Sequence, residues 1–204
     1  MINYAVVGAG WISQEAFLPG VVQSRNSRVA AIVTGDRAKA ARLADFYGIE
    51  TIVGYDGYDA LLESSAIDAV YIALPNDMHA DYAIRAARAG RHILVEKPLA
   101  KSENEALAMI AAARAANVFL MTAYRLHDEA GTAAVLEHIR AGAIGRPLFF
   151  QSVFSFQMAP GNHRLKASAW GAASGCRRLL HQRRPSHLCR RADRGHGDGA
   201  PAKR

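Results

Sequence analysis

Residues 4–13 constrain the fold most, because an apolar, β-branched run there passes through two glycines and continues with helical spacing. A strand, a tight glycine turn and a helix start form the first unit of a dinucleotide-binding fold. Gly8 permits the turn, and Gly10 lets the backbone approach a pyrophosphate. The first N–H groups of the helix, at Trp11 and Ile12, would face that anion. A serine replaces the third glycine of the full motif, so a plain strand–helix turn stays open as an alternative.

Strand-like and helix-like segments alternate through residue 124. After the first strand, the apolar runs predict strands over residues 28–33, 51–55, 67–74, 92–95 and 118–122. The helical patterns between them predict helices over residues 11–24, 36–47, 59–64, 78–89 and 106–116. This alternation is typical of the α/β class, with a doubly wound parallel (Rossmann) sheet covered on both faces. We therefore predict that residues 1–124 form an NAD(P)-binding domain.

The pattern changes after residue 124. Residues 128–141 predict a helix with Val135, Leu136 and Ile139 facing inward, and the aromatic-rich residues 148–157 predict a strand. We interpret residues 125–167 as the start of a second, α+β substrate domain.

The basic charge is confined to the end of the chain. The net charge of +7 belongs to residues 167–204, whereas the residues before them are balanced. The balanced charge of these earlier residues therefore predicts no nucleic-acid partner for the folded part of the chain. Cys176 and Cys189 lack metal-site spacing, so no metal is expected. Two interpretations stay open for residues 168–204: a disordered basic tail, or sequence read out of frame.

The location is predicted from what the chain lacks. No apolar run reaches the length of a membrane span, and the N-terminus does not read as a signal peptide. We expect a cytoplasmic protein without a membrane partner.

The end of the second strand bears on the cofactor. NAD-selective sites usually place an acid there to bind the ribose 2′-hydroxyl. Here Thr34 stands at that position, and Arg37 and Lys39 follow within reach of a 2′-phosphate. This favours NADP, with NAD open because Asp36 is close by.

Three further segments follow predicted strands, where ligands bind in open parallel sheets. After the fourth strand come Leu74, Pro75, Asn76 and His79. Asn76 suits either a cofactor or substrate contact or, like Asp77, a helix cap, and His79 suits a site or a packing role equally.

Glu96-Lys97-Pro98 ends the fifth strand. A partly desolvated lysine near a nicotinamide can polarise a hydroxyl or share in proton transfer, and Glu96 can orient it. A surface ion pair is the alternative. Tyr124 and Arg125 follow the sixth strand, as crevice groups or as a domain-junction hydrogen-bond set.

Three segments in this order resemble the Gfo/Idh/MocA oxidoreductase family. They are the N-terminal Gly-x-Gly, residues 67–76 with His79, and residues 89–98. Residues 124–127, 142–145 and 162–167 resemble its glucose–fructose oxidoreductase-like branch. The resemblance implies hydride transfer between NADP and a sugar-like or cyclic polyol or diol carbon. It also implies that Lys97 is catalytic. The residues that it implies as cofactor contacts are Gly8, Gly10, Trp11, Ile12, Thr34, Arg37, Lys39, Leu74, Pro75, Asn76, His79, Glu96, Lys97, Tyr124 and Arg125.

The resemblance stops near residue 167. The family continues there with a Leu-x-Asp-x-Gly-x-(His or Tyr) motif, which this sequence lacks. A one-nucleotide shift in synonymous codons for residues 174–182 restores such a motif, which motivates the out-of-frame interpretation. We therefore expect a truncated oxidoreductase that is inactive or impaired, and a family-type homo-oligomer is doubtful. The alternative function is a non-catalytic nucleotide-binding module whose basic tail binds an acidic partner.

Overall fold

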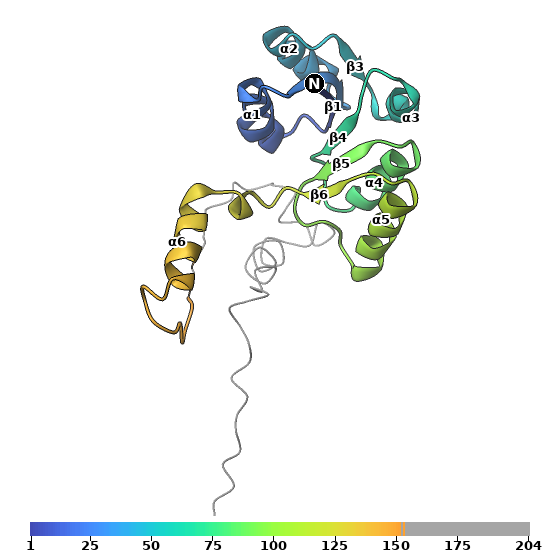
Figure 1. Cartoon of the computed structure of the whole chain (residues 1–204). Helices are drawn as coiled ribbons and strands as arrows, with labels where there is room; N and C mark the ends of the chain where they lie inside the picture. Colours follow the sequence, from blue (N-terminus) through green and yellow to red (C-terminus); the bar gives the residue numbers. More distant parts are fainter. Residues whose placement is uncertain (152, 154–204) are drawn as a thin grey trace, which may run out of the picture.

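The computed structural model describes residues 1–151 and 153, and its centre is a six-stranded sheet with helices on both faces (Figure 1). The strand order is β3-β2-β1-β4-β5-β6, and every pair is parallel. The strands are β1 Ile2–Val7, β2 Ser27–Val33, β3 Thr51–Val53, β4 Ala69–Ile72, β5 His92–Val95 and β6 Leu120–Thr122. The predicted doubly wound α/β fold is confirmed.

Short and long helices connect these strands. They are η1 Ser13–Phe17, α1 Leu18–Gln23, α2 Arg37–Tyr47, η2 Tyr55–Gly57, α3 Tyr58–Glu63, α4 His79–Arg88, α5 Glu103–Ala115, η3 Arg125–His127 and α6 Ala130–Arg140. The predicted elements of the first 124 residues are all present, with ends that differ by a few residues. None of the helices within residues 1–151 and 153 has the length and apolar character needed to cross a membrane.

Alternate strand residues build two cores, one on each face of the sheet. In β1, Val6 packs with residues of α1 and α2, whereas Val7 packs with residues of α3, α4 and α5. In β4, Tyr71 belongs to the same core as Val6, and Ile72 belongs to the same core as Val7. Successive side chains of a strand point to opposite faces, so a strand buried on both faces is apolar throughout. The continuous apolar runs in the sequence follow from this burial.

The helix after the glycine turn contains one widened turn. The sequence predicts an uninterrupted helix over residues 11–24, but η1 is a π-type turn that precedes α1. Pro19 has no N–H to offer the carbonyl of Glu15, and its ring crowds that carbonyl. A π turn is rare and occurs mostly as a single widened turn inside an α-helix, as it does here. The widened turn carries Phe17, whose ring packs on the sheet.

The predicted cap of α4 is wrong. The helix begins after Met78, and no side chain caps it, so neither Asn76 nor Asp77 does. The reason is a preceding turn in which the Met78 N–H donates to the Pro75 carbonyl at 2.9 Å. Asn76 lies within that turn.

The expected inward face of α6 is also wrong within the described residues. No residue of α6 is buried, and Val135 is 58% exposed. Leu136 and Ile139 are only half-buried, and Figure 1 shows α6 apart from the sheet, so these residues do not pack on the sheet. Residues 148–151 and Val153 are exposed and form no strand. The other residues of the strand predicted over 148–157 lie outside the described residues. The interpretations of residues 168–204, including the alternative function, also fall outside them.

Gly8 should be the least replaceable glycine of the sheet edge. Its φ is +98°, and an added Cβ would lie 2.6 Å from the Ala73 carbonyl oxygen. A Cβ at Gly10 would meet nothing within 4 Å. We predict that Gly8→Ala lowers the free energy of unfolding by about 2–4 kcal/mol, because it adds a clash to left-handed strain, whereas Gly10→Ala costs below about 1 kcal/mol. Urea unfolding followed by circular dichroism measures both, and equal midpoints would contradict the prediction.

Candidate functional site

The candidate site lies where the strands end at their carboxyl termini. The first residue beyond each of three adjacent strands continues the backbone ladder to its neighbour. The bonds run from Gly8 N–H to Val33 O (2.8 Å), from Ala73 N–H to Val7 O (2.9 Å) and from Glu96 N–H to Ile72 O (2.9 Å). The glycine turn and Glu96 therefore share one edge, about 10 Å apart across two strand spacings. The strand order reverses between β1 and β4, which is where ligands bind in such sheets.

The glycine turn is built for close approach of backbone. Gly8 lies against the Ala73 carbonyl, at a distance that no larger residue permits. The fully buried Ser13 hydroxyl donates to the Gly8 carbonyl at 2.6 Å. The serine that replaces the third glycine thus fastens the turn to the helix, a role that its position in the motif did not reveal. The space beside Gly10 is open.

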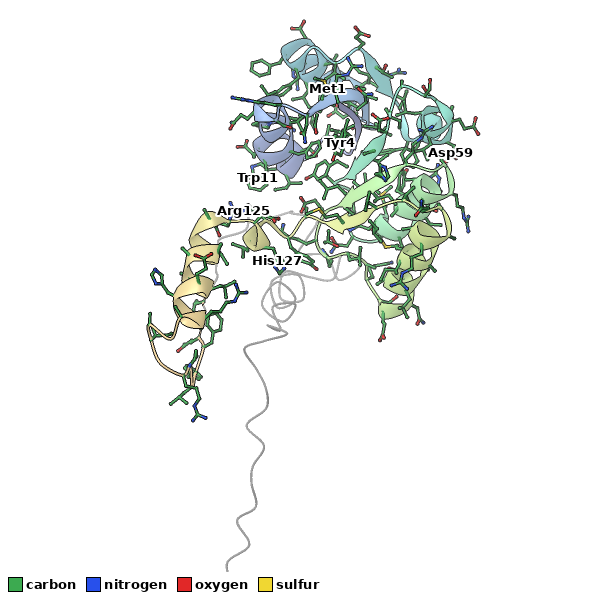
Figure 2. The ribbon with its side chains drawn as sticks, viewed as in Figure 1. Met1, Tyr4, Trp11, Asp59, Arg125 and His127 are labelled. Carbon is green, nitrogen blue, oxygen red and sulfur yellow. The ribbon has the colours of Figure 1, made fainter. Side chains whose placement is uncertain are left out.

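Trp11 and Ile12 follow this turn. The Trp11 side chain is 70% exposed, whereas Ile12 is half-buried. Figure 2 shows Trp11 and Arg125 on the side of the domain from which α6 extends. Trp11 therefore presents a large apolar surface beside the turn.

The buried residue directly after β2 is a threonine and not a carboxylate. Thr34 is 5% exposed, and its hydroxyl accepts the Asp36 N–H at 3.2 Å. Asp36 caps α2 by accepting the Lys39 N–H at 2.9 Å and pairs with the Lys39 ammonium at 3.3 Å. The hydrogen bond from the Lys39 N–H holds the pKa of Asp36 below its usual range. Arg37 is exposed at the start of the helix.

His79 joins the loop after β4 to the loop after β5. Its ring is 1% exposed, with Nε2 2.9 Å from the Leu74 carbonyl oxygen and Nδ1 2.8 Å from that of Pro98. At least one ring nitrogen carries hydrogen, so His79 donates to at least one of these loops. Both nitrogens face protein carbonyls, which favours the packing alternative over direct contact with a cofactor. Pro75 is exposed beside this clamp, and Asn76 is half-buried.

Glu96 and Lys97 form a partly buried pair at the same edge. The Lys97 ammonium lies 3.3 Å from Glu96 Oε2, and its side chain is 31% exposed. The Glu96 side chain is only 13% exposed, and its other oxygen accepts the Tyr71 hydroxyl at 2.8 Å. The Lys97–Pro98 peptide bond is cis. The geometry favours an oriented lysine over a surface ion pair, because the carboxylate is anchored from inside the sheet.

Tyr71 was missed by the sequence analysis. It belongs to the apolar run of β4, where a tyrosine reads as core. The available signal was its position on the strand next to the one that ends in the lysine motif, with a hydroxyl that burial obliges to find a partner.

The segment after β6 lies next along this edge. The ladder continues from the Ala123 N–H to the Val95 carbonyl at 2.9 Å. The Tyr124 ring is half-buried and packs edge-on to the His127 ring at 5.9 Å, and Arg125 is exposed. Both predicted residues therefore come to the same edge as Lys97, and their contacts with a ligand stay predictions.

Neither a metal cluster nor the cavity at the other edge of the sheet competes with this site among the described residues. Within residues 1–151 and 153, no three His, Cys, Asp or Glu side chains gather closely enough to hold a metal ion. A cavity of about 500 Å³ opens at the opposite edge, beside Asn3, Ser27 and Thr51. These residues are at the amino ends of their strands, away from the ligand edge of a parallel sheet.

Comparisons with known proteins bear on the family and the fold of the chain. Residues 2–124 match the family model described as "Oxidoreductase family, NAD-binding Rossmann fold". D-xylose 1-dehydrogenase (NADP(+)) 2 of Haloferax volcanii is 39% identical over 160 residues, which cover 78% of this chain and 47% of that protein. A dTDP-3,4-didehydro-2,6-dideoxy-alpha-D-glucose 3-reductase of Streptomyces antibioticus is 32% identical, covering 84% of this chain and 52% of that protein.

Solved structures show the same fold. An aldose-aldose oxidoreductase from Caulobacter crescentus, complexed with glycerol, aligns with a TM-score of 0.68 at 33% identity, covering 71% of this chain and 44% of that one. The 3-ketoreductase KijD10 from Actinomadura kijaniata, in complex with TDP-benzene and NADP, aligns with a TM-score of 0.66 at 33% identity, covering 71% of this chain and 45% of that one. The chain spans about half the length of the relatives that it matches.

The His79 clamp predicts a stability effect. We expect His79→Ala to lower the free energy of unfolding by about 2–4 kcal/mol, because it opens a cavity and leaves at least one of the two carbonyls without its hydrogen-bond donor. His138→Ala, at an exposed position of α6, should change it by less than about 0.5 kcal/mol. Chemical denaturation measures the difference, and equal values for the two variants would show that the clamp contributes nothing.

Proposed function

Because the chain belongs to the Gfo/Idh/MocA oxidoreductase family, we propose that its sheet edge binds NADP(H). We further propose that the whole protein transfers hydride between this cofactor and a sugar-like or cyclic polyol carbon. Relatives that are named as an NADP-dependent xylose dehydrogenase and as a nucleotide-sugar reductase support both the cofactor and the substrate class.

One observation carries the proposal. The glycine turn and Lys97 lie at the carboxyl ends of β1 and β5, two parallel strands that are separated by β4, on either side of the point where the strand order reverses. A dinucleotide laid across this edge has its pyrophosphate at the turn and its nicotinamide toward β5. A reacting carbon beside the nicotinamide is then next to a lysine.

The described residues fit the nucleotide. The open space beside Gly10 admits a pyrophosphate, and the buried Ser13 hydroxyl keeps the turn in shape. At the ribose end, Thr34 adds no negative charge, and Asp36 is engaged with its own helix. Arg37 and Lys39 then supply positive charge for a 2′-phosphate.

Lys97 is the group proposed to act on the substrate. The nicotinamide supplies or accepts the hydride when it is bound. The Lys97 side chain binds the substrate oxygen by a hydrogen bond. As an ammonium it gives a proton to that oxygen when the substrate is reduced, and as a neutral amine it takes the proton when the substrate is oxidised. Glu96 keeps the ammonium at the crevice while leaving it partly exposed, which suits a group that must reach substrate. Tyr124 and Arg125 follow β6, the strand next to β5, and their proposed role is to border the same space.

The preference between NADPH and NADH directly tests the part of the proposal that concerns nucleotide binding. We predict that the chain binds NADPH about tenfold more tightly than NADH, because Arg37 pairs with the 2′-phosphate. Arg37→Ala should weaken NADPH about five- to tenfold and change NADH by less than about twofold. Isothermal titration calorimetry measures both. Equal losses for the two nucleotides would refute the role of Arg37, and no binding of either would refute the proposal.

Turnover gives a separate test. Among the described residues, the site is built from the nucleotide-binding fold alone, so we expect this 204-residue chain to bind NADP and to oxidise sugars little or not at all. The measurement is NADPH formation with D-xylose or D-glucose, against a sugar-free control. Sugar-dependent NADP reduction that Lys97→Met abolishes would contradict the expected impairment, although it would support the assigned chemistry.

A further inference from the structure

We propose that Tyr71 is a positioning residue, which ties Glu96, and through it Lys97, to the helix that follows the glycine turn. The relevance of this tie to catalysis rests on the function proposed above for Lys97. The tie itself stands on contacts between side chains from three separate segments: η1, β4 and the end of β5.

The hydrogen bonds assign each carboxylate oxygen of Glu96 to one partner side chain. Oε1 accepts the Tyr71 hydroxyl at 2.8 Å. Oε2 lies 3.3 Å from both the Lys97 ammonium and the Lys97 backbone N–H. Since Tyr71 occupies the first oxygen, the second is left facing Lys97. A carboxylate without this anchor would be free to rotate, and the ammonium would follow it.

The Tyr71 hydroxyl is suited to act as a fixed donor. The side chain is 2% exposed, and this burial, with the adjacent charge of Glu96, raises the pKa of Tyr71. The phenol therefore keeps its proton and continues to donate to the carboxylate.

The ring of Tyr71 is fixed from the other side. It stacks on Phe17 with 3.8 Å between ring centroids and an angle of 8° between the planes. Tyr4 packs edge-on to Phe17 at 5.4 Å. Phe17 belongs to the widened turn η1, whose first residue, Ser13, donates to the Gly8 carbonyl. A continuous series of contacts thus joins the glycine turn to the amine of Lys97.

Simple packing is the competing explanation. A phenylalanine at position 71 would stack on Phe17 equally well, and a buried hydroxyl costs free energy unless it is hydrogen-bonded. Tyr58 offers a matched comparison, because it is also fully buried and its hydroxyl donates to the Tyr82 carbonyl at 3.0 Å. It packs in the core of the opposite face, away from Glu96.

The test measures the reactivity of Lys97 in the full-length chain. Limited acetylation with acetic anhydride, read by peptide mass spectrometry, gives the modification rates of Lys97 and Lys101 in one experiment. Lys101 is an internal reference, because its side chain is 33% exposed against 31% for Lys97, and it also pairs with a carboxylate. The variants are Tyr71→Phe, Tyr58→Phe and Glu96→Gln.

We expect Tyr71→Phe to raise the ratio of Lys97 to Lys101 modification about three- to fivefold, toward the value for Glu96→Gln, because the ammonium loses its oriented partner. Tyr58→Phe should lose comparable stability and keep the wild-type ratio. A ratio for Tyr71→Phe that is unchanged or lower would overturn the proposal and leave packing as the role of this residue.

Calorimetric titration of the wild type with NADPH runs in parallel. Absence of binding would refute the proposed function, whereas the acetylation ratio, measured without nucleotide, would still decide whether Tyr71 positions Lys97.

Discussion

The backbone ladder that joins β2, β1, β4 and β5 determines everything at the candidate site. It places the first residue beyond each strand beside its neighbours, so that the glycine turn, the loop after β4 and the lysine motif meet at one edge. The ladder requires Gly8, because only a residue without a side chain can lie against the Ala73 carbonyl. Segments far apart in the sequence become one surface through this backbone packing.

Much of this arrangement could be predicted from the sequence. Strands buried on both faces give continuous apolar runs, so residues such as Val6, Val7 and Ile72 reveal the sheet without any structure. The parallel order then implies that Gly8 and Lys97 share an edge. The site was predictable to the extent that it follows from strand order.

Side-chain contacts across the sheet were not predictable in this way. The position of His79 in the sequence does not favour a site role over a packing role, because the carbonyls that it contacts, those of Leu74 and Pro98, belong to two separate loops. Tyr71 reads as an ordinary core residue, and its partner Glu96 is known only once the register of β4 and β5 is fixed. The predicted cap at Asn76 failed because a turn delayed the start of the helix. The prediction that Val135 faces inward failed because apolar periodicity predicts an apolar helix face but does not show which element packs against it.

The account depends on a nicotinamide lying beside Lys97 at the carboxyl edge of the sheet. The direct measurement is an isotope-filtered NMR experiment on the labelled chain with bound NADP⁺, which detects nuclear Overhauser effects (NOEs) between nicotinamide ring protons and protein side chains. The account predicts NOEs to the methylene protons of Lys97. NOEs only to residues of the opposite edge, such as Asn3 or Ser27, would contradict it.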